Sequence, residues 1–219
     1  MTHKVVVIDP GHNGQNYAHP EILKQQVDAG FGQKKDCNAT GTETNDGYTE
    51  ALFNWKVALH LKADLEARGI TVKMTRSSND GVGPCVNERA AFGNDSDAAA
   101  VISIHGDGDL NNGVTGFYVM TAERDPAGPE MAAQSARLAK DVRDSLVAGG
   151  SSPSNSLGQD GLWKRGDLSG LNLSVRPTVM VEMGNMRSDH DAALMTSAEG
   201  QDQYAAGLAA GVIKYLIGQ

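Results

Sequence analysis

Three short runs of apolar, largely β-branched residues are the feature that most constrains the fold of this chain. They cover residues 4–9 (KVVVID), 98–105 (AAAVISIH) and 177–183 (PTVMVEM). Residues 50–68 and 129–147 instead repeat their apolar side chains at helical spacing. Buried strands that alternate with amphipathic helices are typical of a sheet with helices on both faces. We therefore expect a three-layer α/β/α protein.

Weaker patterns supply the remaining elements. Strands are predicted over 70–74 and 115–120, a short helix over 87–92, and a final helix from about 199 to 216. Two stretches lack sustained periodicity and are predicted to be loops. These are residues 12–48, a length that usually indicates a functional or mobile segment, and the Gly- and Ser-rich residues 149–170. No internal repeat or linker interrupts the pattern, so we expect residues 1–219 to form a single domain.

Composition excludes some classes of protein. The net charge of −8 argues against binding nucleic acid through bulk electrostatic attraction. No apolar stretch approaches the ~20 residues that a membrane-spanning helix needs. No signal peptide is visible, because the first strand-like run begins near Lys4.

Cys37 and Cys85 are the only two cysteines, and their spacing excludes a CxxC metal site. They could be two unrelated thiols or one disulfide, and we favour the disulfide. Closing a loop of this length would stabilise the fold by about 4 kcal/mol in the chain-entropy model. A disulfide would also indicate a protein that works outside the cytosol.

Residues able to bind a metal or move a proton stand near the ends of the predicted strands. His12 follows the first strand, His105 ends the central one, Glu182 lies within the late one, and Glu50 opens the first helix. Ligands of open α/β sheets bind beyond the carboxyl ends of the strands. Two histidines and one carboxylate form a catalytic zinc site with an open position, and a second carboxylate can transfer protons. Together they suffice for amide hydrolysis.

Each of these residues also has an ordinary explanation. His12 could be a polar turn residue, His105 a hydrogen-bonded core histidine, and Glu50 a residue favoured by the helix dipole. His19 is the one other plausible ligand. Glu182 is harder to explain, because it interrupts an apolar strand and a buried carboxylate must be paired or functional.

A structural ion pair is the alternative explanation for Glu182. Arg76 and Arg89 are the candidate partners. Under this alternative Glu182 would contribute to stability and not to chemistry.

Five segments, in order along the chain, resemble the zinc-dependent N-acetylmuramoyl-L-alanine amidases that share a fold with zinc exopeptidases. The resemblance covers almost the whole length of the chain. The first two segments are Val7 to Gly14 (VIDPGHNG) and Glu50 with Asn54. The third joins Thr75-Arg76 to Asp80 and Glu88-Arg89, and the last two are Ser103 to Asp107 (SIHGD) and Pro177 to Asn185 (PTVMVEMGN). One such match could be chance, but five in register are specific.

The resemblance implies both the fold and the roles of the residues. It implies a six-stranded, mostly parallel sheet flanked by helices. By position, His12, Glu50 and His105 would bind zinc, and Glu182 would be the general acid/base. The substrate would be peptidoglycan or its fragments, cut between N-acetylmuramic acid and L-alanine during wall remodelling, septum cleavage or recycling.

Further expectations follow from the same resemblance. The chain would act as a secreted, autolysin-type monomer in the periplasm or cell wall, after removal of a signal peptide that this chain lacks. No separate cell-wall-binding domain is expected. Asn13, Asp107 and Asn185 depart from the residues usual at these positions, beside the site and not within it.

Two other functions fit parts of the pattern. A zinc exopeptidase of similar architecture often uses two metals, and the chain offers too few additional ligands for a second. A catalytically silent peptidoglycan-binding module would lack Glu182 or a zinc ligand, and all four residues are present.

Overall fold

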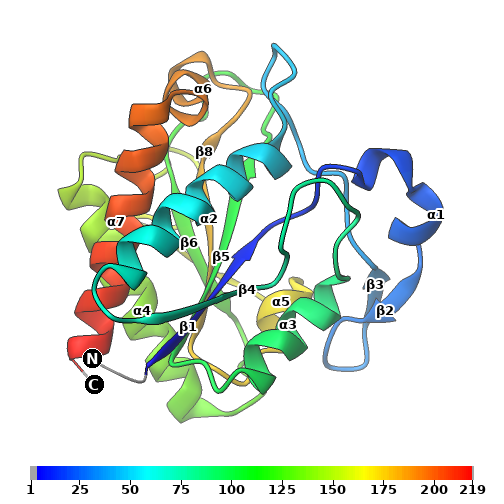
Figure 1. Cartoon of the computed structure of the whole chain (residues 1–219), viewed down its shortest axis with the longest axis vertical. Coiled ribbons are helices and arrows are strands. Elements are labelled where there is room, and N and C mark those ends of the chain that lie inside the picture. Colours follow the sequence, from blue (N-terminus) through cyan, green and yellow to red (C-terminus); the bar gives the residue numbers. More distant parts are fainter. Residues whose placement is uncertain (1–3, 219) are drawn as a thin grey trace.

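The computed structural model describes residues 4–218 and contains a central six-stranded sheet (Figure 1). From one edge to the other its strands are β4 (Thr71–Met74), β1 (Val5–Pro10), β5 (Ala100–Asp107), β8 (Thr178–Asn185), β6 (Tyr118–Ala122) and β7 (Leu162–Arg165). The first four strands are parallel, whereas β6 pairs antiparallel with β8 and parallel with β7. The predicted α/β class with a mostly parallel six-stranded sheet is confirmed.

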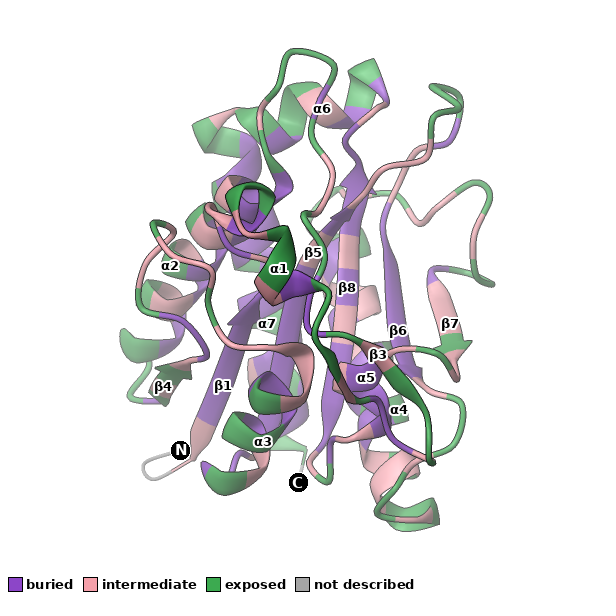
Figure 2. Cartoon of the chain, turned by 90° about the vertical axis from the view of Figure 1, so that its right-hand side faces the viewer, coloured by how far each residue is buried: buried purple, intermediate pink, exposed green. Residues whose placement is uncertain are grey.

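Helices cover both faces of this sheet. The long helices α2 (Glu50–Glu66), α4 (Pro129–Ala148) and α7 (Ala198–Ile217) enclose the main core on one face. The shorter α3 (Val86–Asp95) and α5 (Ser169–Asn172) lie on the other face, in front of the strands in Figure 2. The helix α6 (Asp189–Thr196) follows β8. Among the described residues, no helix is both long and apolar enough to cross a membrane.

Side chains that alternate along the strands point either into the main core or to the opposite face of the sheet. Ile8, Ile104 and Val181 belong to the main core under the long helices. Their neighbours Asp9, His105 and Glu182 therefore lie on the opposite face, because successive side chains of a strand point to opposite sides. That face is less completely covered, and Glu182 is only partly buried.

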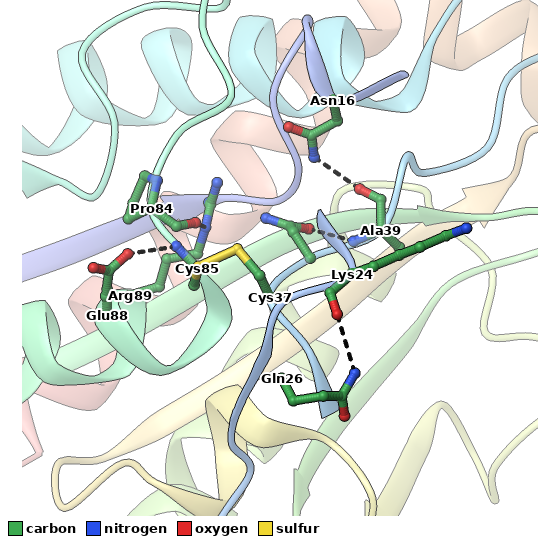
Figure 3. The surroundings of a disulfide bond; sticks show 10 residues. Asn16, Lys24, Gln26, Cys37, Ala39, Pro84, Cys85, Glu88 and Arg89 are labelled. Atoms are coloured by element: carbon green, nitrogen blue, oxygen red, sulfur yellow. Dashed lines mark hydrogen bonds between the residues drawn. A yellow bond between two sulfur atoms is a disulfide. The ribbon is translucent and has the colours of Figure 1, made fainter. Parts of the chain in front are cut away.

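Residues 12–48 are not one irregular loop. They contain a 3₁₀ turn (Asn16–Ala18), α1 (Pro20–Leu23) and a small antiparallel pair formed by β2 (Gln26–Asp28) and β3 (Lys34–Asp36). The predicted disulfide between Cys37 and Cys85 is present, with the two Cα atoms 4.5 Å apart. It fastens this segment to the start of α3 (Figure 3).

The prediction of a loop over residues 149–170 was wrong in part. Strand β7 and the start of α5 lie within it. Strand β7 has the sequence LWKR, is only four residues long and forms the edge of the sheet, so it has no buried apolar run to reveal it. The predicted helix over 87–92 extends over Val86–Asp95, and the predicted strand over 115–120 starts later, at Tyr118.

Candidate active site

His12, Glu50 and His105 come together at the carboxyl end of the sheet. One potential ligand atom from each lies within 4.8 Å of the others. Glu50 Oε2 is 3.1 Å from His12 Nε2, and Glu50 Oε1 is 2.9 Å from His105 Nδ1. The three residues come from the loop after β1, the first turn of α2 and β5. Two nitrogen donors and one carboxylate in this arrangement could hold a divalent cation.

The backbone around His12 makes this approach possible. His12 has a positive φ of 58°, a conformation that non-glycine residues rarely adopt. A Cβ on the preceding Gly11 would lie only 2.2 Å from His105 Cε1, so a side chain there would displace the imidazole. Glycine at position 11 therefore lets the His12 and His105 rings approach edge to face, with ring centroids 5.0 Å apart.

Neighbouring groups orient each candidate ligand. His12 Nδ1 donates to the carbonyl oxygen of Ala39 at 3.0 Å, which turns Nε2 toward Glu50 and the candidate metal position. Glu50 Oε1 accepts hydrogen bonds from Asn54 Nδ2 and the Gly106 N–H, and Oε2 accepts one from the Thr42 N–H. Asn54 lies four residues after Glu50, one helical turn along α2, and its side-chain amide therefore reaches the Glu50 carboxylate.

The carboxylate of Glu50 is ionised despite its burial. Burial raises its pKa, but the charge of His12 and hydrogen bonds from both histidines outweigh this effect. The pKa of Glu50 consequently lies well below its usual range. A buried carboxylate that stays ionised between two imidazoles is suited to bind a cation.

Glu182 lies beside this group, opposite His105 in the register of β5 and β8. Burial, together with the negative charges of Glu50 and Asp107, raises the pKa of Glu182 well above its usual range. Its Oε2 atom is buried and has no hydrogen-bond partner among the described residues. Such a carboxyl is suited to exchange protons and not to bind a fixed structural partner.

The ion-pair alternative for Glu182 was wrong in its choice of partners. Arg89 pairs with Asp9 at 2.8 Å, and Arg76 donates to backbone carbonyls, including those of Pro10 and Ala51. Neither arginine is paired with Glu182. The alternative ligand His19 lies 3.1 Å from the exposed Glu21 and is not part of the His12 group.

Sequence reasoning missed Tyr118, a neighbour of Glu182. Tyr118 lies opposite Glu182 in the β6–β8 register, and its hydroxyl donates to Asp107 Oδ2 at 3.1 Å. Burial and the charges of Glu182 and Asp107 raise the pKa of Tyr118, so its hydroxyl stays protonated. No motif marks Tyr118, because its position follows from the antiparallel direction of β6.

Comparison with known proteins decides the family. A family model described as N-acetylmuramoyl-L-alanine amidase matches residues 6–214. The chain belongs to this amidase family. It is 44% identical over 215 residues to N-acetylmuramoyl-L-alanine amidase Rv3717 of Mycobacterium tuberculosis, across 98% of this chain and 87% of that protein.

Solved structures agree with the family assignment. The amidase Ami1 of Mycobacterium smegmatis is 40% identical, with a TM-score of 0.94 and coverage of 100% of this chain and 99% of that one. Ami1 of Mycobacterium abscessus is 39% identical, again with a TM-score of 0.94, and the match covers 99% of this chain and 100% of that one. The present chain is therefore an enzyme of the peptidoglycan amidase class.

Proposed function

We propose that this amidase is zinc-dependent, with His12, Glu50 and His105 as metal ligands and Glu182 as general acid/base. The observation that carries the proposal is the His12–Glu50–His105 group, with its ligand atoms within 4.8 Å of one another. The bond cut is the amide between N-acetylmuramic acid and L-alanine. The substrate is peptidoglycan or its fragments.

The donor set fits zinc. Imidazole nitrogens and a carboxylate are common zinc ligands, and three of them leave one position open for catalysis. The hydrogen bond from His12 Nδ1 to Ala39 and those from Asn54 and Thr42 to Glu50 resemble the outer contacts that orient metal ligands. When bound, zinc supplies a Lewis acid that polarises a carbonyl oxygen and makes water a nucleophile at neutral pH.

Glu182 performs the proton transfers. Its raised pKa gives it a higher proton affinity than an exposed glutamate has. It takes a proton from the attacking water and gives it to the leaving nitrogen of L-alanine. The protonated hydroxyl of Tyr118 donates to Asp107 Oδ2 at 3.1 Å, so this carboxylate has a partner of its own.

Three further proposals concern the protein as a whole. Residues 1–219 act as one catalytic domain, which is supported by the single family model that spans residues 6–214. The enzyme works outside the cytoplasm as a secreted autolysin-type protein, in agreement with its disulfide. It acts as a monomer.

The exopeptidase alternative is less well supported. Within residues 4–218, His12, Glu50 and His105 form one group able to hold a metal, and no second group of three His, Cys, Asp or Glu residues lies next to it. Two-metal hydrolysis would need ligands that hold a second metal about 3.5–4 Å from the first.

The test combines metal removal with product analysis. Chelation should abolish cleavage, and one equivalent of zinc per chain should restore it. Mass spectrometry of muropeptides should detect free lactyl carboxylate and a new L-alanine amino terminus. Full activity in a demonstrably metal-free sample, or cleavage at another bond, would refute the proposal.

A further inference from the structure

A short segment, residues 37–42, runs from the disulfide to the candidate metal site. It begins with Cys37, which is bonded to Cys85. Two residues later, the Ala39 carbonyl oxygen accepts a hydrogen bond from Nδ1 of His12 at 3.0 Å. The disulfide is therefore only two residues away, along the chain, from a direct contact with a proposed zinc ligand.

The other end of this segment contacts a second proposed ligand. The Thr42 N–H donates to Glu50 Oε2 at 2.9 Å, and the Thr42 carbonyl oxygen accepts the Glu50 N–H, also at 2.9 Å. Between these contacts and Ala39 lies Gly41, with a φ of 81°. A Cβ on Gly41 would lie 2.8 Å from Glu50 Oε2 and 2.9 Å from His12 Cδ2. The backbone of the segment thus passes directly against both ligands.

Asn16 holds the same carbonyl oxygen as His12. Its Nδ2 donates to the Ala39 carbonyl oxygen at 2.7 Å, a bond drawn in Figure 3. Asn16 is only 1% exposed, and its Oδ1 is buried without a hydrogen-bond partner among the described residues. An unpaired buried acceptor costs stability. Asn16 is therefore better explained by the bond that it makes to Ala39 than by a contribution to the stability of the fold.

The second cysteine also leads to His12. Cys85 is the N-cap of α3, and Arg89, near the start of this helix, donates from Nη2 to the His12 carbonyl oxygen at 2.8 Å. The Val86 N–H donates to the Cys37 carbonyl oxygen at 2.8 Å, so a hydrogen bond accompanies the disulfide. One side of the bridge therefore reaches the His12 side chain, and the other side reaches its backbone.

Residues 37–42 lie outside the central sheet. They follow the antiparallel pair of β2 and β3, each of which is three residues long. A two-stranded pair of this length is marginally stable by itself, so the position of the segment depends on tertiary contacts such as the disulfide. Loss of the disulfide should therefore increase the motion of this segment more than that of the central sheet.

We propose that Cys37, Cys85 and Asn16 are positioning residues for zinc, which hold the Ala39 carbonyl oxygen in place and so set the zinc affinity of the site. The inference rests on the proposed function, because it takes the enzyme to be zinc-dependent. Groups that orient a metal-bound histidine typically change metal affinity 10–100-fold when they are removed. Ligands that are already in place bind more tightly, because less conformational freedom is lost on binding.

The experiment measures zinc affinity by competition with a chromophoric chelator, and the melting temperature of the zinc-free protein on the same samples. The double variant Cys37→Ser/Cys85→Ser removes the bridge and leaves no thiol that could bind zinc elsewhere. Asn16→Ala removes one hydrogen bond and keeps the bridge. Leu146→Ala, in the main core on α4, is the control. A large-to-small core substitution destabilises a protein about as much as the loss of a disulfide does.

The variants should separate zinc affinity from stability. The double variant should bind zinc about 10–100-fold more weakly than the wild type, and Asn16→Ala about tenfold more weakly. Leu146→Ala should keep wild-type zinc affinity although its melting temperature falls by a similar amount. At saturating zinc, below their melting temperatures, the double variant and Asn16→Ala should recover most of the wild-type kcat, because the ligands themselves are unchanged.

A combination of the variants tests whether they act through the same contact. Asn16→Ala added to the double variant should weaken zinc binding by less than the product of the two separate effects, because both act on Ala39. Fully multiplicative effects would contradict this shared route.

Other results would overturn the inference. If the wild type requires zinc but the double variant binds it equally tightly, the disulfide only stabilises the fold and the proposed function stands. If Leu146→Ala loses zinc affinity to the same extent, affinity follows global stability and the inference fails. Wild-type affinity in Asn16→Ala would exclude its positioning role, and this variant decides the matter if the double variant does not fold. If the wild type cleaves without zinc, the proposed function fails and the inference with it.

Discussion

Arg89 donates a hydrogen bond from Nη2 to the carbonyl oxygen of His12 at 2.8 Å. The same guanidinium bonds Asp9 Oδ1 and the carbonyl oxygen of Pro10 from Nη1, both at 2.8 Å. The His12 backbone has a strained positive φ, which persists only when its surroundings hold it. Arg89 therefore holds the loop that presents the first candidate zinc ligand.

Replacing Arg89 by Met should weaken zinc binding by about 10- to 100-fold, the range typical of lost outer contacts. It should also destabilise the protein by about 3–5 kcal/mol, because Asp9 would remain as an unpaired buried charge. Competition with a chromophoric chelator measures the first effect and urea unfolding the second. Arg68→Met removes only a bond to the Asp64 carbonyl and serves as control. Wild-type zinc affinity in Arg89→Met would contradict the role of Arg89.

The Asp9 carboxylate should make stability depend on acid pH. Burial raises its pKa, but Arg89, Thr75 and Ser103 outweigh burial and lower the pKa from 3.8 to about 2. Because the folded pKa is the lower one, the stabilisation is complete above the unfolded pKa and is lost as pH falls through the folded value. It amounts to about 2 kcal/mol.

Urea unfolding of the metal-free protein between pH 6 and pH 2 tests this expectation. Asp9→Asn should be less stable than the wild type at pH 6, and the difference should shrink between pH 4 and pH 2. A difference that stays constant over this range would show that Asp9 does not titrate as described.

The Cys37–Cys85 disulfide closes a sequence separation of 48 residues. In the chain-entropy model its removal by Cys→Ser at both positions should cost about 4 kcal/mol. Non-reducing peptide mapping should recover the linked peptides, and urea unfolding should give the cost. Two free thiols after oxidative refolding, or equal stability of the double variant, would contradict this expectation.

Much of the fold could be predicted from local patterns. The runs in β1, β5 and β8 are buried on both faces of the sheet, so their β-branched residues are nearly continuous. Helices α2 and α4 have long repeats of apolar residues, which gave their positions to within a few residues. Edge strand β7 and the short elements of residues 12–48 carry no such repeat and were missed.

The site was predictable in its residue types and less so in its geometry. His12, Glu50, His105 and Glu182 were identified from strand ends and from the family resemblance, and the structure brings them together. Contacts between distant segments could not be read from the sequence. Examples are the hydrogen bond from His12 Nδ1 to the Ala39 carbonyl oxygen and the buried Asn38 Nδ2, which has no partner among the described residues.

Glu182 offers the most direct test of the proposed mechanism. In the metal-free protein, replacing it by Gln removes a charge that burial, Glu50 and Asp107 disfavour, so the fold should be at least as stable as in the wild type. A structural ion pair would predict the opposite. Glu123→Gln, at an exposed position, is the matched control.

The decisive measurement is the rate at which zinc-loaded Glu182→Gln cleaves a muramoyl-L-alanine substrate, with zinc content and melting temperature determined on the same sample. We predict wild-type zinc content, an undiminished melting temperature and a rate about 10²–10⁴-fold below wild type, as expected when a general acid/base is lost. A folded, zinc-loaded variant that cleaves at near wild-type rate would contradict the mechanism.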